Sequence, residues 1–132
     1  MSEENVDIVR MIYERWGTGD LSAFAGLLEP DAEFVNPPDA IDAGTRHGPL
    51  GFAGAWQAVL DAFDSSRHDV KELSEVGGHV IASVVFQAEG TQSGVAVEQP
   101  EFHVWTLRNG RIARFAWFRS MKEALEAAGA GE

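Results

Sequence analysis

The sequence predicts an α+β fold in which three N-terminal helices pack in the concave face of a curled antiparallel sheet, followed by a short C-terminal helix. Two observations carry this prediction. Helical patterns occupy most of residues 2–63, and four strand-like stretches separated by turn residues follow between residues 68 and 118. A sheet that covers the apolar faces of the helices must curl, which makes a cone with a closed end and a mouth.

Caps, glycines and prolines bound the expected helices. The first begins at Ser2, carries apolar residues at spacings of three and four, and ends at Gly17. A short second helix is expected between Asp20 and Pro30. The third runs over residues 48–63 with Pro49 in its first turn, where proline is favoured.

The expected strands alternate with turn signals. A short strand at residues 32–36 stops at Pro37 and is followed by a predicted loop over residues 39–47. The longer strands are expected at about 68–76, 79–89, 95–107 and 111–118. Asn109 and Gly110 predict a tight hairpin between the last two, and Pro100 predicts a bulge or an edge. A capping box at Ser120 opens the terminal helix.

Composition narrows the class of protein. The 132 residues fit a single domain over 1–132, and 21 acidic against 10 basic residues give a net charge of −11. This charge argues against nucleic acid and anionic membranes as partners. Cysteine is absent and the acidic start does not resemble a signal peptide, so a cytoplasmic location is expected.

The last two strands are apolar on both faces. His103 and Trp105 share one face with Phe115, Trp117 and Arg119 of the neighbouring strand. The opposite face holds Phe102, Val104, Ile112 and Phe118. A sheet exposed on one side normally carries polar residues there, so we expect a homodimer through this outer face.

Several stretches resemble a known superfamily. They are Gly19–Leu21, Leu28–Phe34, His47–Pro49, Ser93–Gly94, His103–Ile112 and Glu123–Gly129. Together with the element order, they resemble the nuclear transport factor 2-like superfamily, and most closely its SnoaL-like, polyketide cyclase-like branch. The resemblance covers nearly the whole chain and implies the cone fold. It leaves the activity open, because the superfamily holds isomerases, dehydratases, cyclases, epoxide hydrolases and non-enzymatic members.

The resemblance can be carried over position by position. The carboxylate base of ketosteroid isomerase-like members matches Asn36, their helical tyrosine matches Ile12, and their second oxyanion donor matches His103. Tyr13 neighbours Ile12 and is expected to point elsewhere, about 100° around the helix. The late aspartate of the cyclases has no counterpart after Trp117. Neither of these two mechanisms is therefore expected.

The strongest catalytic candidate is His103, because a neutral imidazole can act as a general base near neutral pH. Asn36 is assigned to orient a carbonyl or a water, and Arg119 to bind a carboxylate or a developing enolate. These roles suit proton abstraction next to a carbonyl in a small hydrophobic molecule, as in isomerisation, cyclisation or dehydration. The expected ligand-binding wall consists of Trp16, Trp56, Trp105, Phe115 and Trp117.

Plainer interpretations remain open beside this one. His103 can be a satisfied core residue, Asn36 can serve a turn before proline, and Arg119 can pair with a surface carboxylate. The whole cone can bind a ligand without turnover, or it can be filled by its own tryptophans in a dimerisation module. No His or carboxylate pair shows metal-binding spacing, so neither a metal nor another cofactor is expected.

Overall fold

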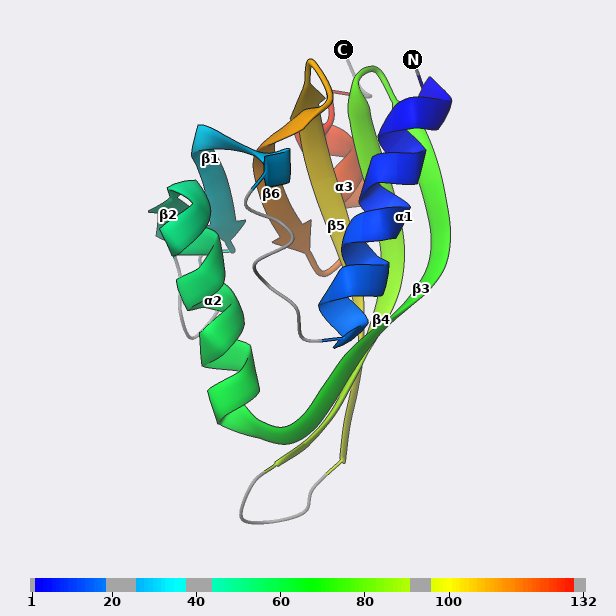
Figure 1. The fold of residues 1–132 in the computed structure, drawn as a ribbon. Helices are drawn as coiled ribbons and strands as arrows, with labels where there is room; N and C mark the ends of the chain where they lie inside the picture. Colours follow the sequence, from blue (N-terminus) through cyan, green and yellow to red (C-terminus); the bar gives the residue numbers. More distant parts are fainter. Residues whose placement is uncertain (1, 19–25, 38–43, 91–95, 130–132) are drawn as a thin grey trace.

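A computed structural model describes residues 2–18, 26–37, 44–90 and 96–129 of the chain (Figure 1). The described helices are α1 (Ser2–Thr18), α2 (Gly48–Ala62) and α3 (Met121–Ala127). The described strands are β1 (Leu28–Asn36), β2 (Gly44–His47), β3 (Phe63–Val76), β4 (His79–Gly90), β5 (Ala96–Arg108) and β6 (Arg111–Phe118). None of the helices in these ranges has the length and apolar character needed to cross a membrane.

The strands form one curled sheet in the order β2-β1-β6-β5-β4-β3. Neighbours are antiparallel except β1 and β6, which run parallel. The four predicted long strands are confirmed, although β3 begins earlier, at Phe63. The predicted loop over residues 39–47 is wrong in its described part, because residues 44–47 form β2 and pair with β1.

The prediction of three N-terminal helices is wrong. Among the described residues, α1 is N-terminal, α2 lies between β2 and β3, and α3 is C-terminal. Residues 19–25 of the expected second helix lie outside the described residues, and Leu28 already belongs to β1. Pairing of Leu28 with Ile112, and of Phe34 with Phe115, places these apolar side chains in the sheet. Tertiary pairing has therefore overridden the local helical spacing.

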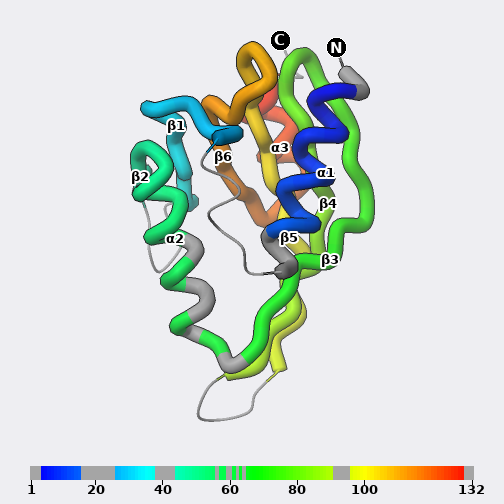
Figure 2. Tube along the Cα trace, viewed as in Figure 1, coloured from blue at the N-terminus to red at the C-terminus, as the bar shows by residue number. Residues whose placement is uncertain are grey.

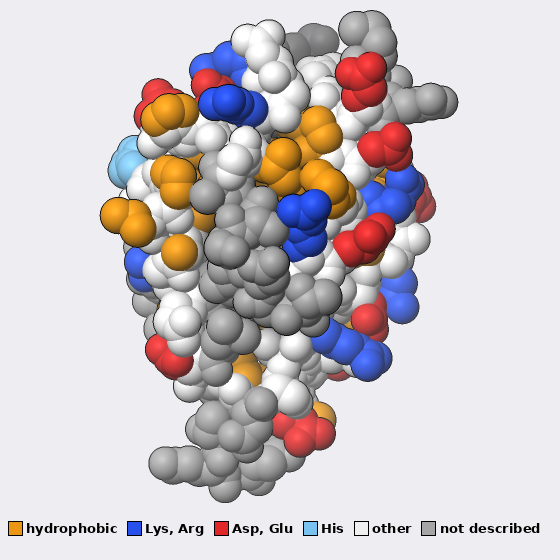
Figure 3. All heavy atoms as spheres, in the orientation of Figure 1, with side chains coloured by type: hydrophobic (Ala, Val, Ile, Leu, Met, Phe, Trp, Pro, Cys, Tyr) orange, Lys and Arg blue, Asp and Glu red, His pale blue; other side chains and the backbone are white. Residues whose placement is uncertain are grey.

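The two faces of the sheet are covered by different helices. Figures 1 and 2 show α1 and α2 on one side and α3 on the other. The main core lies between the sheet and α1 and α2, and it includes Val9, Phe34, Phe52, Trp105 and Phe115. On the face of the molecule drawn in Figure 3, acidic and basic side chains are interspersed over the described surface.

Part of the expected dimer face is covered by the chain itself. Val104 and Ile81 are buried against Ala124 and Ala128 of the C-terminal segment. The predicted cap at Ser120 forms, since the Glu123 amide N–H donates to Ser120 Oγ at 3.2 Å. Val104 therefore packs inside the monomer, and the prediction that it lies at an intermolecular surface is wrong.

Ile112 does not lie on the outer face of the sheet either. The pairing of β5 with β6 shifts between Thr106 opposite Arg114 and Leu107 opposite Ile112, so that Ala113 is an extra residue on β6. One extra residue in a strand reverses the alternation of its side chains. Ile112 consequently joins the main core on the same face as Phe115.

The turn and edge predictions are confirmed. Asn109 and Gly110 have φ values of 54° and 78°, the left-handed pair that a tight hairpin turn requires. Pro100 pairs with Val85 of β4 in regular register, while the pairing of β5 with β6 ends at Phe102. Pro100 therefore occupies a local edge, where no hydrogen bond to β6 is needed.

Candidate functional site

A polar cluster lies in the main core at the centre of the sheet. Glu101 and His103 are the buried polar side chains there, with exposed fractions of only 8% and 1%. They stand two residues apart on β5, so both point to the inner face, and Trp105 continues the same row. Burial of a carboxylate is costly unless hydrogen bonds or opposite charges compensate it. The hydrogen-bond partners of Glu101 therefore show how its burial is compensated.

The hydrogen bonds of His103 fix which ring nitrogen carries the proton. Its Nε2 lies 2.8 Å from Oε1 of Glu101, and its Nδ1 lies 2.5 Å from the hydroxyl oxygen of Tyr13. An ionised carboxylate only accepts hydrogen bonds, so Nε2–H of His103 is the donor. In the neutral imidazole, Nδ1 is then the acceptor of the Tyr13 O–H.

The chain of hydrogen bonds continues at both ends. Trp105 Nε1–H donates to the Tyr13 oxygen at 2.9 Å, and Gln99 donates to Oε2 of Glu101 at 3.1 Å. A line of polar groups thus runs from Trp105 through Tyr13 and His103 to Glu101 and Gln99. Such a buried network holds each member in one orientation.

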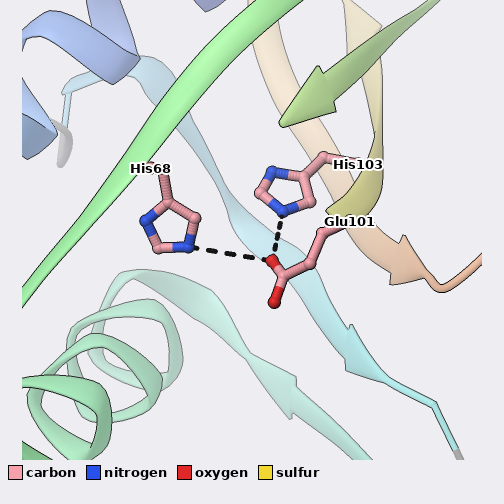
Figure 4. A group of neighbouring side chains, drawn as sticks. All are labelled: His68, Glu101 and His103. Carbon is pink, nitrogen blue, oxygen red and sulfur yellow. Dashed lines mark hydrogen bonds and ion pairs between the residues drawn. The ribbon is translucent and has the colours of Figure 1, made fainter. Parts of the chain in front are cut away.

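His68 reaches the cluster from β3 (Figure 4), and β4 lies between β3 and β5 in the sheet. Its Nε2 lies 3.8 Å from Oε1 of Glu101, and its ring centroid is 5.6 Å from that of His103. Val84 of β4 pairs with Glu101 on one side and Val70 on the other, so a whole strand separates the two side chains. The curl of the sheet brings them together over β4.

Burial shifts the protonation of the cluster. Burial, with added repulsion from His103, lowers the pKa of His68 to about 3, so this imidazole is neutral. Burial alone would raise the pKa of Glu101, but the hydrogen bond and charge of His103, with help from His68 and Gln99, outweigh it and lower that pKa. Burial raises the pKa of Tyr13 well above its ordinary value, which keeps the phenol O–H as a donor.

A second group forms beside this cluster. Trp117 lies directly opposite His103 in the β5–β6 ladder, and its Nε1–H donates to Asn36 Oδ1 at 2.7 Å. The Arg119 guanidinium carbon lies 5.2 Å from the centre of a Trp117 ring, a cation–π distance. The structure therefore gathers Asn36 and Arg119 at Trp117, one cross-strand position from His103.

The residues predicted to form the ligand-binding wall differ in how deeply they are buried. Trp105 and Phe115 are almost fully buried, with ring centroids 4.5 Å apart, and the Phe115 centroid lies 5.1 Å from that of His103. These two residues therefore pack the core around the imidazole. Trp117 is half-buried. The side chains of Trp16 and Trp56 lie outside the described residues.

Tyr13, Glu101 and His68 were not predicted to be site residues. Tyr13 was expected to point elsewhere, and this is wrong, because its hydroxyl contacts His103. Glu101 carried a usable signal: it stands two residues before His103 on a predicted strand, so both side chains share a face. His68 carried none, since only the curl of the sheet places it there.

Comparison with known proteins agrees with the fold. The family model for the SnoaL-like domain matches residues 9–115. The uncharacterised protein Rv0034 of Mycobacterium tuberculosis is 27% identical over 94% of this chain and 95% of its own length. An NTF2-like protein of unknown function from Burkholderia pseudomallei has a solved structure that is 25% identical, with a TM-score of 0.80 over 96% of this chain and 97% of its own.

A further similar structure is IdmH from Streptomyces antibioticus, a proposed polyketide cyclase. It is 23% identical, and its TM-score is 0.75 over 96% of this chain and 98% of its own. At this level of identity the likeness shows the shared fold alone.

Proposed function

Because the chain belongs to the SnoaL-like domain family, we propose that it is an enzyme that moves a proton next to a carbonyl in a small hydrophobic molecule, in an isomerisation, cyclisation or dehydration. The observation that carries the proposal is the buried Glu101 carboxylate hydrogen-bonded to His103 at 2.8 Å. A carboxylate that orients an imidazole and stabilises its protonated form is the arrangement that makes histidine an effective base. The relation to IdmH suggests a polyketide-like substrate.

In the proposed step, His103 is the base and Tyr13 is the oxyanion donor. The two groups contact each other, and they must separate so that the substrate carbonyl lies between them. The C–H bond next to the carbonyl breaks, its proton goes to Nδ1 of His103, and its electron pair forms an enolate. The Tyr13 O–H then donates to the enolate oxygen instead of to Nδ1.

The remaining groups hold this pair in place. Glu101 accepts Nε2–H and stabilises the imidazolium, while Gln99 fixes the other carboxylate oxygen. The imidazolium returns its proton to another carbon in an isomerisation, or to the new alkoxide after the enolate attacks a second carbonyl. In a dehydration the enolate electron pair forms a C=C bond as the C–O bond to a β-hydroxyl group breaks, and the imidazolium proton goes to that oxygen, which leaves as water. Asn36 and Arg119, grouped at Trp117, are proposed to orient the substrate, with Arg119 binding an anionic group.

Proton exchange at carbon tests the proposal before a natural substrate is known. The probe is 2-tetralone, a fused-ring apolar ketone, and NMR in D2O follows the loss of its proton signals next to the carbonyl. The wild-type protein should accelerate this exchange above buffer, and Glu101→Gln should remove most of the acceleration. Wild-type protein that exchanges no faster than buffer, or a Glu101→Gln variant as fast as wild type, would overturn the proposal.

A binding protein without turnover is the second candidate. It is favoured by one observation: both ring nitrogens of His103 already have partners, as in a purely structural buried network. Such a protein should bind 2-tetralone, seen as a saturable change in tryptophan fluorescence, without exchange above buffer. Saturable binding together with Glu101-dependent exchange excludes this candidate.

The homodimer and the cytoplasmic location are proposals as well. The outer face keeps Phe102 and Phe118, which pair across β5 and β6 and are half-buried against the α3 cluster. A dimer would bury what α3 leaves exposed of these rings. Light scattering should then give twice the mass of the chain at micromolar concentration, and Phe118→Ser should shift it towards monomer. A monomeric wild type contradicts this interface.

A further inference from the structure

The group of His68, Glu101 and His103 has a composition found in metal sites. One donor atom from each residue, two imidazole nitrogens and one carboxylate oxygen, lies within 4.8 Å of the other two. Figure 4 shows the three side chains, from β3 and β5, converging on one point. The sequence alone did not predict this set of three ligands. Glu101 and His103 follow His68 by 33 and 35 residues, so the three do not form a local motif.

We propose that His68 Nε2, His103 Nε2 and Glu101 Oε1 bind a divalent first-row transition-metal ion, with Zn²⁺ as the probe. Two histidines and one carboxylate are an established set of protein ligands for such ions. Three protein ligands leave at least one position on the metal for water or for an oxygen of a bound molecule.

The spacing of the donor atoms is close to that of an occupied site. Bonds of roughly 2.1 Å in a tetrahedral site separate the donor atoms by about 3.4 Å. The Glu101 oxygen lies 2.8 Å from the His103 nitrogen and 3.8 Å from the His68 nitrogen, which brackets that value. The two imidazoles must approach each other, and His68 on β3 is the less deeply buried of the two.

The groups around the donors are those that hold metal ligands in place. Gln99 donates to the second oxygen of Glu101, which fixes the plane of the carboxylate. The Tyr13 hydroxyl lies at Nδ1 of His103, the nitrogen that carries the proton once a metal occupies Nε2. A phenol can accept from that N–H as well as donate to the free nitrogen. Partners of this kind typically change metal affinity 10–100-fold.

The charge of the cluster suits a cation. The ion would replace the proton shared between His103 and Glu101, and it meets a chain whose net charge is −11. Occupied Nε2 places the ring proton on Nδ1, so the metal-bound form cannot use His103 as the proposed base. The metal site therefore goes beyond the proposed function and would switch that function off.

The test is calorimetric titration of the EDTA-treated, dialysed full-length protein with ZnCl2. Wild type should bind one ion per chain with micromolar or tighter affinity, and His68→Gln should weaken binding at least tenfold. His47→Gln is the matched control, because His47 is exposed and lies outside the cluster, and it should bind like wild type. Weak, non-stoichiometric binding by wild type, or equal affinity in His68→Gln, would overturn the proposal.

A second measurement uses only the wild-type protein, so its result does not depend on whether a variant folds. Co²⁺ bound by wild type should give the strong visible absorption of a four- or five-coordinate site with nitrogen ligands, and Zn²⁺ should displace it. The weak spectrum of hydrated Co²⁺ contradicts the site. To keep failure here separate from failure of the proposed enzyme, the ketone exchange assay is repeated with EDTA-treated protein, on which the metal has no bearing.

Discussion

The hydroxyl of Tyr13 offers the most exacting test of the buried network. Replacing Tyr13 by Phe keeps the ring, which packs against Trp105 with centroids 5.6 Å apart, and removes only the oxygen. Trp105 Nε1–H then loses its acceptor and His103 Nδ1 loses its donor. Loss of a buried hydrogen-bond partner costs about 1–3 kcal/mol for each group left behind.

The expected loss in unfolding free energy is therefore about 2–4 kcal/mol, allowing for some relaxation around His103. Equilibrium unfolding in urea, followed by circular dichroism, measures it directly. Thr106→Val is the control, since it removes a hydroxyl that bonds His79 at 2.9 Å in a part-buried position. This change should cost about 1 kcal/mol or less, because water can replace the partner.

A double-mutant cycle isolates the contact with the indole. In a Trp105→Phe background the N–H is absent, so Tyr13→Phe should cost about 1–2 kcal/mol less than it does in wild type. A Tyr13→Phe cost below about 0.5 kcal/mol, or costs that add without coupling, would refute the hydrogen-bond chain as described.

Three further outcomes are expected from the fold, each measured as a loss of unfolding free energy in urea. Phe115→Ala should cost about 3–5 kcal/mol, because the ring is almost fully buried in the main core; a loss under 1 kcal/mol contradicts that packing. Ser120→Ala should cost about 1 kcal/mol by removing the cap of α3, and an unchanged midpoint would argue against the cap. Gly110→Ala should cost about 1–2 kcal/mol, because φ is 78° there; equal stability would mean that the turn adopts another conformation.

Local signals accounted for most of the fold. Asn109 and Gly110 set the last hairpin, Pro49 opened α2, and Ser120 capped α3, all through interactions within a few residues. The expected second helix is wrong where it reaches Leu28, because the spacing of Leu28 suited a helix while its pairing with Ile112 makes it part of a strand. The bulge at Ala113 was not predicted either, since it depends on the register of two strands.

The candidate site depended more on distant contacts. His103 was identified because its strand and its face could be predicted from local alternation. Tyr13 and His68 lie on α1 and β3, and they reach His103 only after α1 packs on the sheet and the sheet curls. No spacing rule links residues so far apart in the sequence. The covering of Val104 by α3 was hidden for the same reason.

In the proposed mechanism His103, held by Glu101 and Tyr13, takes a proton from carbon. The most direct measurement compares the exchange of 2-tetralone protons in D2O for wild type and His103→Gln, with circular dichroism to show that both are folded. Wild type should exchange well above buffer and the variant should lose at least tenfold, in line with the usual contribution of a general base of about 10²–10⁴-fold. A folded His103→Gln protein that exchanges as fast as wild type would contradict it.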